Sequence, residues 1–162
     1  MASHPTTHTR ADSSQRLATL AFIAAALVLF FAIDLAADVM ARIAIQGQSL
    51  ELATREHLYY ASVQLPGTAF LSLPYVGMAF IGLPVLRRRG AVAGTLFLLC
   101  GAALLGGVYW FGYQQSALSM VARHWTAAAL TMGMMPILSV PVLLLAFGVR
   151  LLATRGRTIR PV

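Results

Sequence analysis

The chain contains no lysine and no asparagine, a single cysteine, and only five acidic residues among its 162. One cysteine, Cys100, excludes a disulfide within the chain and any paired-cysteine zinc or redox motif. Charge of either sign is scarce, because 10% of the residues are charged and 59% are hydrophobic, whereas a soluble domain has roughly 25% charged residues. This composition predicts a protein of the lipid bilayer. The missing lysine and asparagine use A-rich codons, so we expect a GC-rich, bacterial source.

Four stretches are long and apolar enough to cross a bilayer, which takes about 20 residues at ~1.5 Å rise each. Hydrocarbon offers the backbone no hydrogen-bond partner, so each stretch must be a helix. We therefore predict an all-α, integral membrane four-helix bundle. Its helices are expected at about 17–37, 60–86, 91–113 and 125–149, within a transmembrane domain of residues 16–152. A disordered cytoplasmic tail, 1–15, and a basic cytoplasmic tail, 153–162, are expected to flank it.

The arginines predict the orientation. With both termini in the cytoplasm, nine arginines lie inside and three outside, which satisfies the positive-inside rule. The inner set is Arg10, Arg16, Arg87, Arg88, Arg89, Arg150, Arg155, Arg157 and Arg160, and the outer set is Arg42, Arg55 and Arg123. We predict a multi-pass protein of the bacterial inner membrane. The net charge of +7 is expected to attract anionic lipid headgroups. The arginines are scattered over the tails and one loop, which argues against nucleic acid as a partner.

The first apolar run closes on a polar stripe. Asp34, Asp38 and Arg42 follow one another at intervals of four residues, which places them on one helix face near the outer membrane surface. Charges near a helix end are cheaper than central ones, so the stripe is expected to face water or a partner loop. The alternative is a ligand or proton site.

The remaining outer residues keep that alternative open. Glu56, His57 and His124 are expected on the same side as Asp34 and Asp38. Imidazole and carboxylate groups suit zinc, copper or non-haem iron, so these five residues form a candidate polar or metal site, with a quinone as a second possible occupant. Against this, no HxxxH or ExxH spacing concentrates the ligands. If there is no such site, the two histidines are interfacial residues of an aromatic belt, together with Tyr59, Tyr60 and Trp125.

The chain also suggests an internal repeat. A shift of 67 residues superposes LSLPYVGMAF, at 71–80, on LSVPVLLLAF, at 138–147, and pairs His57 with His124. This pattern predicts a 2+2 parallel repeat of helical hairpins, with the two histidines in equivalent places around a central axis.

Prolines and small residues predict how the helices bend and pack. Helix kinks are expected at Pro66, Pro74, Pro136 and Pro141, because proline removes a backbone donor. Close helix packing is expected at Gly90, Gly94, Ala102 and Gly106.

Residues 16–80, with the run REHLYYASVQLPGTAFLSLPYVGMAF, resemble the first two helices of the catalytic subunits of B-type haem-copper oxidases. In that family paired tyrosines lead into a helix whose His-Gly histidine ligates a haem. Here Pro66-Gly67 stands in that place, so the haem ligand is missing. The resemblance implies an oxidase-derived or oxidase-associated membrane piece and not an oxidase.

These observations favour a non-catalytic accessory or assembly subunit of a respiratory or redox membrane complex, with other membrane subunits or further copies of itself as partners. One alternative is a small membrane oxidoreductase or metal-binding protein that uses the outer histidines and carboxylates. A second is a small transporter, which the lack of charge near the middle of the membrane argues against. No cofactor is required by the sequence.

Overall fold

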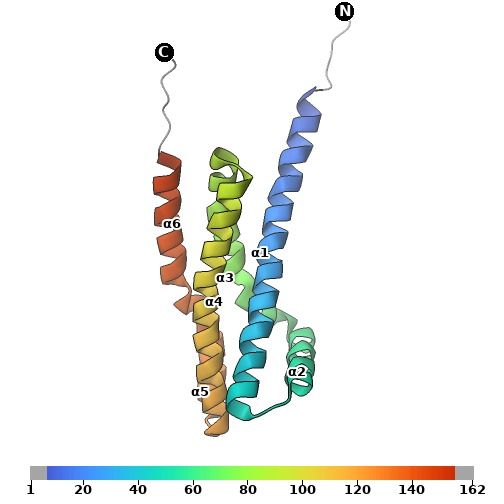
Figure 1. The fold of residues 1–162 in the computed structure, drawn as a ribbon, viewed down its shortest axis with the longest axis vertical. Coiled ribbons are helices and arrows are strands. Elements are labelled where there is room, and N and C mark those ends of the chain that lie inside the picture. The colour runs from blue at the N-terminus through green and yellow to red at the C-terminus, as the bar shows by residue number, and fades with distance from the viewer. Residues whose placement is uncertain (1–6, 156–162) are drawn as a thin grey trace, which may run out of the picture.

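The computed structural model describes the backbone of residues 7–155 and the side chains of residues 15–155. Every element in this part of the chain is a helix (Figure 1). The six helices are α1 (Thr7–Gln46), α2 (Leu50–Val63), α3 (Leu65–Arg89), α4 (Ala91–Val121), α5 (Trp125–Leu138) and α6 (Val140–Arg155). Four helical stretches are long and apolar enough to cross a membrane, namely 15–46, 65–89, 91–121 and 125–155. The prediction of an all-α four-helix membrane bundle is confirmed.

Helix α4 lies at the centre of the bundle and contacts α1, α3, α5 and α6. The short helix α2 packs beside α1 and α3 at one end of the molecule. The start of α1, the turn between α3 and α4, and the end of α6 lie together at the opposite end (Figure 1). The arginines of that turn are therefore separated from α2 by the length of the bundle, which is the arrangement that the arginine distribution predicts. Which end faces the cytoplasm stays a prediction.

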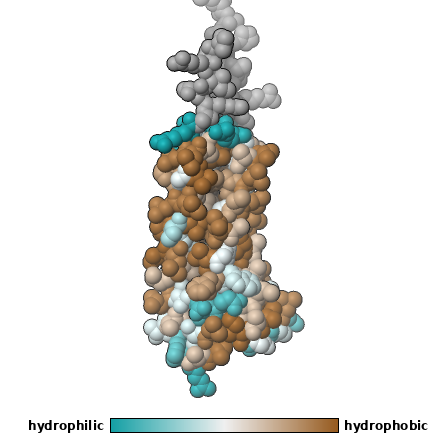
Figure 2. Space-filling view, turned by 60° about the vertical axis from the view of Figure 1, so that its left-hand side comes forward, coloured by the Kyte–Doolittle hydropathy of each residue, from teal (hydrophilic) through white to brown (hydrophobic). Residues whose placement is uncertain are grey.

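The outer surface of the bundle matches a lipid environment. Figure 2 shows a broad hydrophobic band between hydrophilic residues at the two ends of the described part. Leucine, valine and phenylalanine side chains are exposed along all the spans, as at Leu20, Leu73, Leu104 and Leu144. In a bilayer these side chains contact lipid, so their exposure carries no hydrophobic cost.

The interior contains an aromatic cluster midway along the bundle. The rings of Phe30, Tyr75 and Tyr109 meet edge to face or tilted, with centroids 5.5 Å apart for Phe30 and Tyr75 and 5.4 Å for the two tyrosines. The Tyr109 hydroxyl donates to the carbonyl of Leu71. These contacts join α1, α3 and α4 in the middle of the bundle.

The second predicted helix, 60–86, is two helices in the structure. Helix α2 ends at Val63, α3 begins at Leu65, and Gln64 lies between them outside both. Pro66 occupies the first turn of α3, where its missing N–H costs nothing. The prediction of a kink at Pro66 is therefore wrong, because this proline begins a helix.

The other three prolines of the kink prediction lie inside a helix or directly after a break. Pro74 is inside α3 and Pro136 is inside α5. Pro141 stands in the first turn of α6, directly after the interruption at Ser139 that separates α5 from α6. The fourth predicted helix, 125–149, is thus also divided in two.

The helix ends differ from the prediction because apolar composition reports only the part of a helix that lies in lipid. Helix α1 extends beyond 17–37 at both ends, and α4 continues past residue 113 to Val121. The tail predicted as disordered, 1–15, is helical from Thr7 onward, while residues 1–6 lie outside the described residues. Of the tail predicted at 153–162, residues 153–155 belong to α6 and the rest lie outside the description.

Three of the four predicted packing residues lie at close contacts. A Cβ on Gly94 would stand 2.8 Å from the Leu86 side chain, one on Gly106 would stand 3.3 Å from Ile33, and Ala102 is buried. Gly90 is different, because it forms the turn between α3 and α4 at φ +90° with nothing within 4 Å. Its prediction as a packing residue is wrong, since the requirement there is a left-handed backbone.

The two halves of the chain differ where the repeat predicts equivalence. Helix α2 separates the first two spans, whereas residues 122–124 alone connect α4 to α5. His57 is buried on α2, and His124 is exposed in the short connection. The similarity between α3 and the pair α5 and α6 stays a prediction, but the two histidines have different surroundings.

Candidate functional site

The polar stripe of α1 faces the interior of the protein. Asp34 is 3% exposed and Asp38 is 7% exposed. The stripe was expected to face water or a partner loop; it does not face open water, since α2, from the segment between the first two spans, and α4 cover it. A buried carboxylate must be paired or hydrogen-bonded, and in a membrane-spanning helix such groups are candidates for function. The partners of the two aspartates define the site.

His57 lies between the two aspartates, and it is 8% exposed. Its Nδ1 is 2.9 Å from Oδ2 of Asp38, and its Nε2 is 3.7 Å from Oδ2 of Asp34. Helix α2 delivers this ring, and its first turn is capped by Ser49, whose hydroxyl accepts from the Leu52 N–H at 3.3 Å. The Ser49 cap and the break at Gln64 define the two ends of α2. His57 lies on the face of α2 that packs against α1, where it reaches both carboxylates.

Arg42 holds the outer side of the cluster. Its Nε donates to both oxygens of Asp38, at 3.0 and 2.9 Å, and its Nη1 donates to Oε2 of Glu56 at 2.7 Å. Gln48 donates to the same Glu56 oxygen at 3.2 Å. Because α1 and α2 are joined by these charge-assisted bonds, the short helix is fixed against the span.

Tyr113 completes the cluster from α4. Its hydroxyl donates to Oδ1 of Asp34 at 2.6 Å, and its side chain is buried. The sequence analysis did not single out this residue. The available signal was a tyrosine within a span that has no charged residue, because a phenol in hydrocarbon needs a hydrogen-bond partner.

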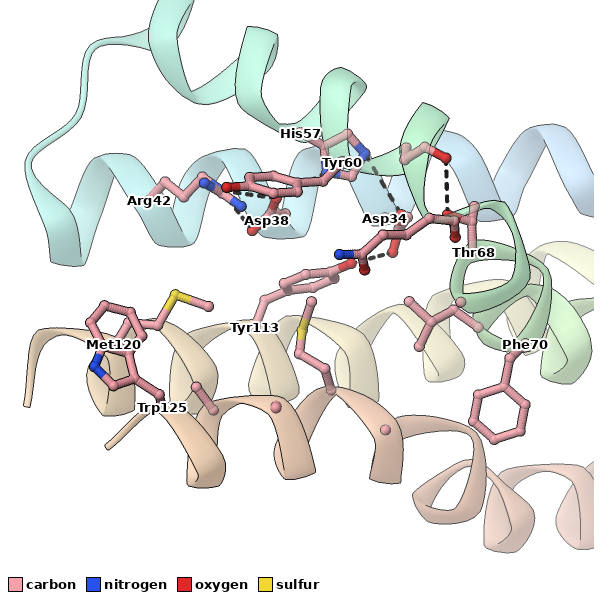
Figure 3. Close-up of a pocket in the computed structure, with 18 residues that line it drawn as sticks. Asp34, Asp38, Arg42, His57, Tyr60, Thr68, Phe70, Tyr113, Met120 and Trp125 are labelled. Carbon is pink, nitrogen blue, oxygen red and sulfur yellow. Dashed lines mark hydrogen bonds and ion pairs between the residues drawn. The ribbon is translucent and has the colours of Figure 1, made fainter. Parts of the chain in front are cut away.

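A pocket of about 410 Å³ lies beside these residues (Figure 3). Its polar wall comes from α1, α2 and α4, with Asp34, Asp38, Arg42, His57, Tyr60 and Tyr113. Its apolar wall comes mainly from α3 and α5, and includes Phe70, Leu71, Trp125, Ala128, Ala129, Met132 and Gly133. The remaining lining residues are Ala61, Gln64, Gly67, Thr68 and Met120. The volume lies within the range of roughly 300–1,000 Å³ that is usual for small-molecule sites.

The candidate site from the sequence is thus brought together in part. Asp34, Asp38 and His57 line the pocket, and Glu56 joins them through Arg42 without lining it. His124 is exposed at the start of α5 and lines no part of the pocket. Among residues 15–155, no group of three or more histidine, cysteine or acidic side chains is arranged to hold a metal ion. The reason is visible at Asp38, whose oxygens are bound to Arg42 and His57.

No protein-family model, curated protein or solved structure matches this chain.

Proposed function

We propose that this chain is a non-catalytic membrane protein that binds an amphipathic small molecule in the pocket between α1, α2, α3 and α5. One observation supports the proposal above the others: a cavity of about 410 Å³ has an ionisable wall on one side and an apolar wall on the other. A ligand with a polar head and an apolar body satisfies both walls at once, and such a ligand reaches the site from the bilayer.

The hydrogen bonds of the cluster favour binding over catalysis. The Arg42 and Tyr113 side chains donate to the carboxylates of Asp38 and Asp34, respectively. Charged groups held this way keep fixed orientations, which suits a site that positions the polar head of a ligand. The hypothesis of an accessory subunit of a respiratory or redox complex is compatible with this role, because a subunit without chemistry of its own can carry a ligand site.

Tryptophan fluorescence provides a direct test, because Trp125 lines the pocket and Trp110 is the only other tryptophan. In a Trp110→Phe background, the protein in lipid nanodiscs is titrated with bromodecanol, whose bromine quenches an indole that it contacts. We expect a saturable component of quenching. Quenching that grows linearly with the alcohol, without saturation, would contradict the proposal.

A matched pair of glycine variants separates pocket binding from partition into lipid. A Cβ on Gly133 or on Gly148 meets nothing within 4 Å, but only Gly133 lines the pocket. Gly133→Leu therefore fills the cavity and is expected to remove the saturable component, whereas Gly148→Leu is expected to retain it. Equal quenching curves for the two variants would count against a pocket ligand. Mass spectrometry of the protein purified in mild detergent tests the partner hypothesis in parallel, through the subunits that remain bound.

A further inference from the structure

The ionisable wall of the pocket has more negative charge than positive. Asp34 and Asp38 stand in this wall, and Glu56 adjoins it through Arg42 without lining the pocket. Among the side chains of residues 15–155, Arg42 is the one arginine that pairs with these three carboxylates. With a neutral His57 the cluster has a net charge of −2, from three negative groups and one positive, and with a charged His57 it has −1. In either state a cation is the complementary ligand.

One carboxylate oxygen lacks a hydrogen bond within the described part of the chain. Oδ1 of Asp34 accepts from Tyr113 at 2.6 Å, whereas Oδ2 lies 3.7 Å from Nε2 of His57. That distance exceeds the usual range of about 2.7–3.2 Å for an N–H donor. Asp34 is 97% buried, as its 3% exposure states, and it lines the pocket. A buried, incompletely satisfied anion is costly, so this oxygen is the acceptor that a ligand would satisfy.

Several donors of the wall hold its carboxylates. Tyr113 donates to Asp34 and Arg42 donates to Asp38 (Figure 3), and Arg42 also donates to Glu56. A headgroup that accepts hydrogen bonds would compete with these carboxylates or use the remaining N–H groups of Arg42, whereas a headgroup that donates disturbs none of these bonds. The preference for a donating headgroup therefore follows from the carboxylate oxygens that line the pocket.

Building on the proposed function, we propose that the ligand is an amphipathic cation with a protonated amine, whose N–H donates to Oδ2 of Asp34. Its apolar body lies against the Phe70 and Met132 side chains of α3 and α5. Tyr60 stands in the polar wall, with the Arg42 guanidinium 5.9 Å from the centroid of its ring.

The test uses the same Trp125 fluorescence with three matched probes, namely bromodecylamine, bromodecanol and bromodecanoate. We expect the amine to bind most tightly. Asp34→Asn should weaken the amine about tenfold or more, which corresponds to a lost charge-assisted hydrogen bond, and should leave bromodecanol little changed. Glu51→Gln removes an exposed acid of α2 and serves as the control for general surface charge.

The outcomes distinguish this inference from the proposed function. If all three probes bind saturably and equally, and Asp34→Asn changes none of them, the pocket exists but the inference about its ligand is overturned. If no probe gives saturable quenching, the proposed function itself fails.

Discussion

The ion pair between Arg42 and Asp38 gives the sharpest test of the packing of α1. The Arg42 Nε lies 3.0 and 2.9 Å from the two Asp38 oxygens, and the aspartate is 7% exposed. At an effective dielectric constant of about 20, two unit charges about 4 Å apart attract by ~4 kcal/mol. Removing one partner of a buried pair leaves the other uncompensated, which costs about 3–5 kcal/mol. Arg42→Gln should therefore destabilise the bundle by about that amount.

A double-mutant cycle isolates the pairwise part of this energy. Arg42→Gln and Asp38→Asn are measured singly and together by unfolding in mixed micelles of rising SDS content, followed by tryptophan fluorescence. The double variant removes both charges, so it should cost about 2–4 kcal/mol less than the sum of the single variants. Arg55→Gln is the control, because Arg55 is exposed on α2 and a surface change of this kind stays within about 0.5 kcal/mol. A coupling energy below about 0.5 kcal/mol would refute the reasoning.

Two further predictions concern packing and topology. Gly94→Ala should destabilise the bundle by about 1–3 kcal/mol, because its Cβ would lie 2.9 Å from the backbone Cα of Leu86. Gly107→Ala, whose Cβ would meet open space, should stabilise the bundle by up to about 1 kcal/mol in the same unfolding assay. Equal effects of the two substitutions would contradict the helix contact at Gly94. In a Cys100→Ser background, Arg55→Cys and Arg88→Cys should be labelled by an impermeant thiol reagent from opposite sides of the membrane, and labelling of both from one side would contradict the bundle's orientation.

The spans could be predicted from the sequence because the bilayer is a uniform solvent. A stretch such as 91–113 needs only length and apolar composition to be recognised as a helix in lipid, and α4 indeed covers it. The end of the bundle at which the acids gather was predictable for the same reason. The spacing of Asp38 and Arg42 also predicted their ion pair, which forms at 2.9 Å.

The direction in which the stripe faces could not be predicted. In a soluble helix the apolar face reveals the core, but α1 is apolar on the faces that meet lipid and on the faces that meet α4. Helical periodicity therefore does not distinguish the buried face of α1 from its lipid-facing one, and Asp34 was expected to face water or a partner loop. Tyr113, its hydrogen-bond partner, is 79 residues away in the chain, so no local pattern connects the two.

The sequence by itself determined the solvent of this protein, its four crossings, and the clustering of scarce carboxylates near one surface, because each of these depends on composition along a single stretch of chain. Only the tertiary structure decided that Asp34 and Asp38 face inward, that α2 forms a separate helix which inserts His57 between them, that Gly90 is a turn residue, and that α3 and α5 supply an apolar wall opposite the charges. The physical reason is that these features depend on which helices become neighbours. In lipid, that choice is made by close packing and buried hydrogen bonds between distant segments, and hydropathy along the chain does not encode it.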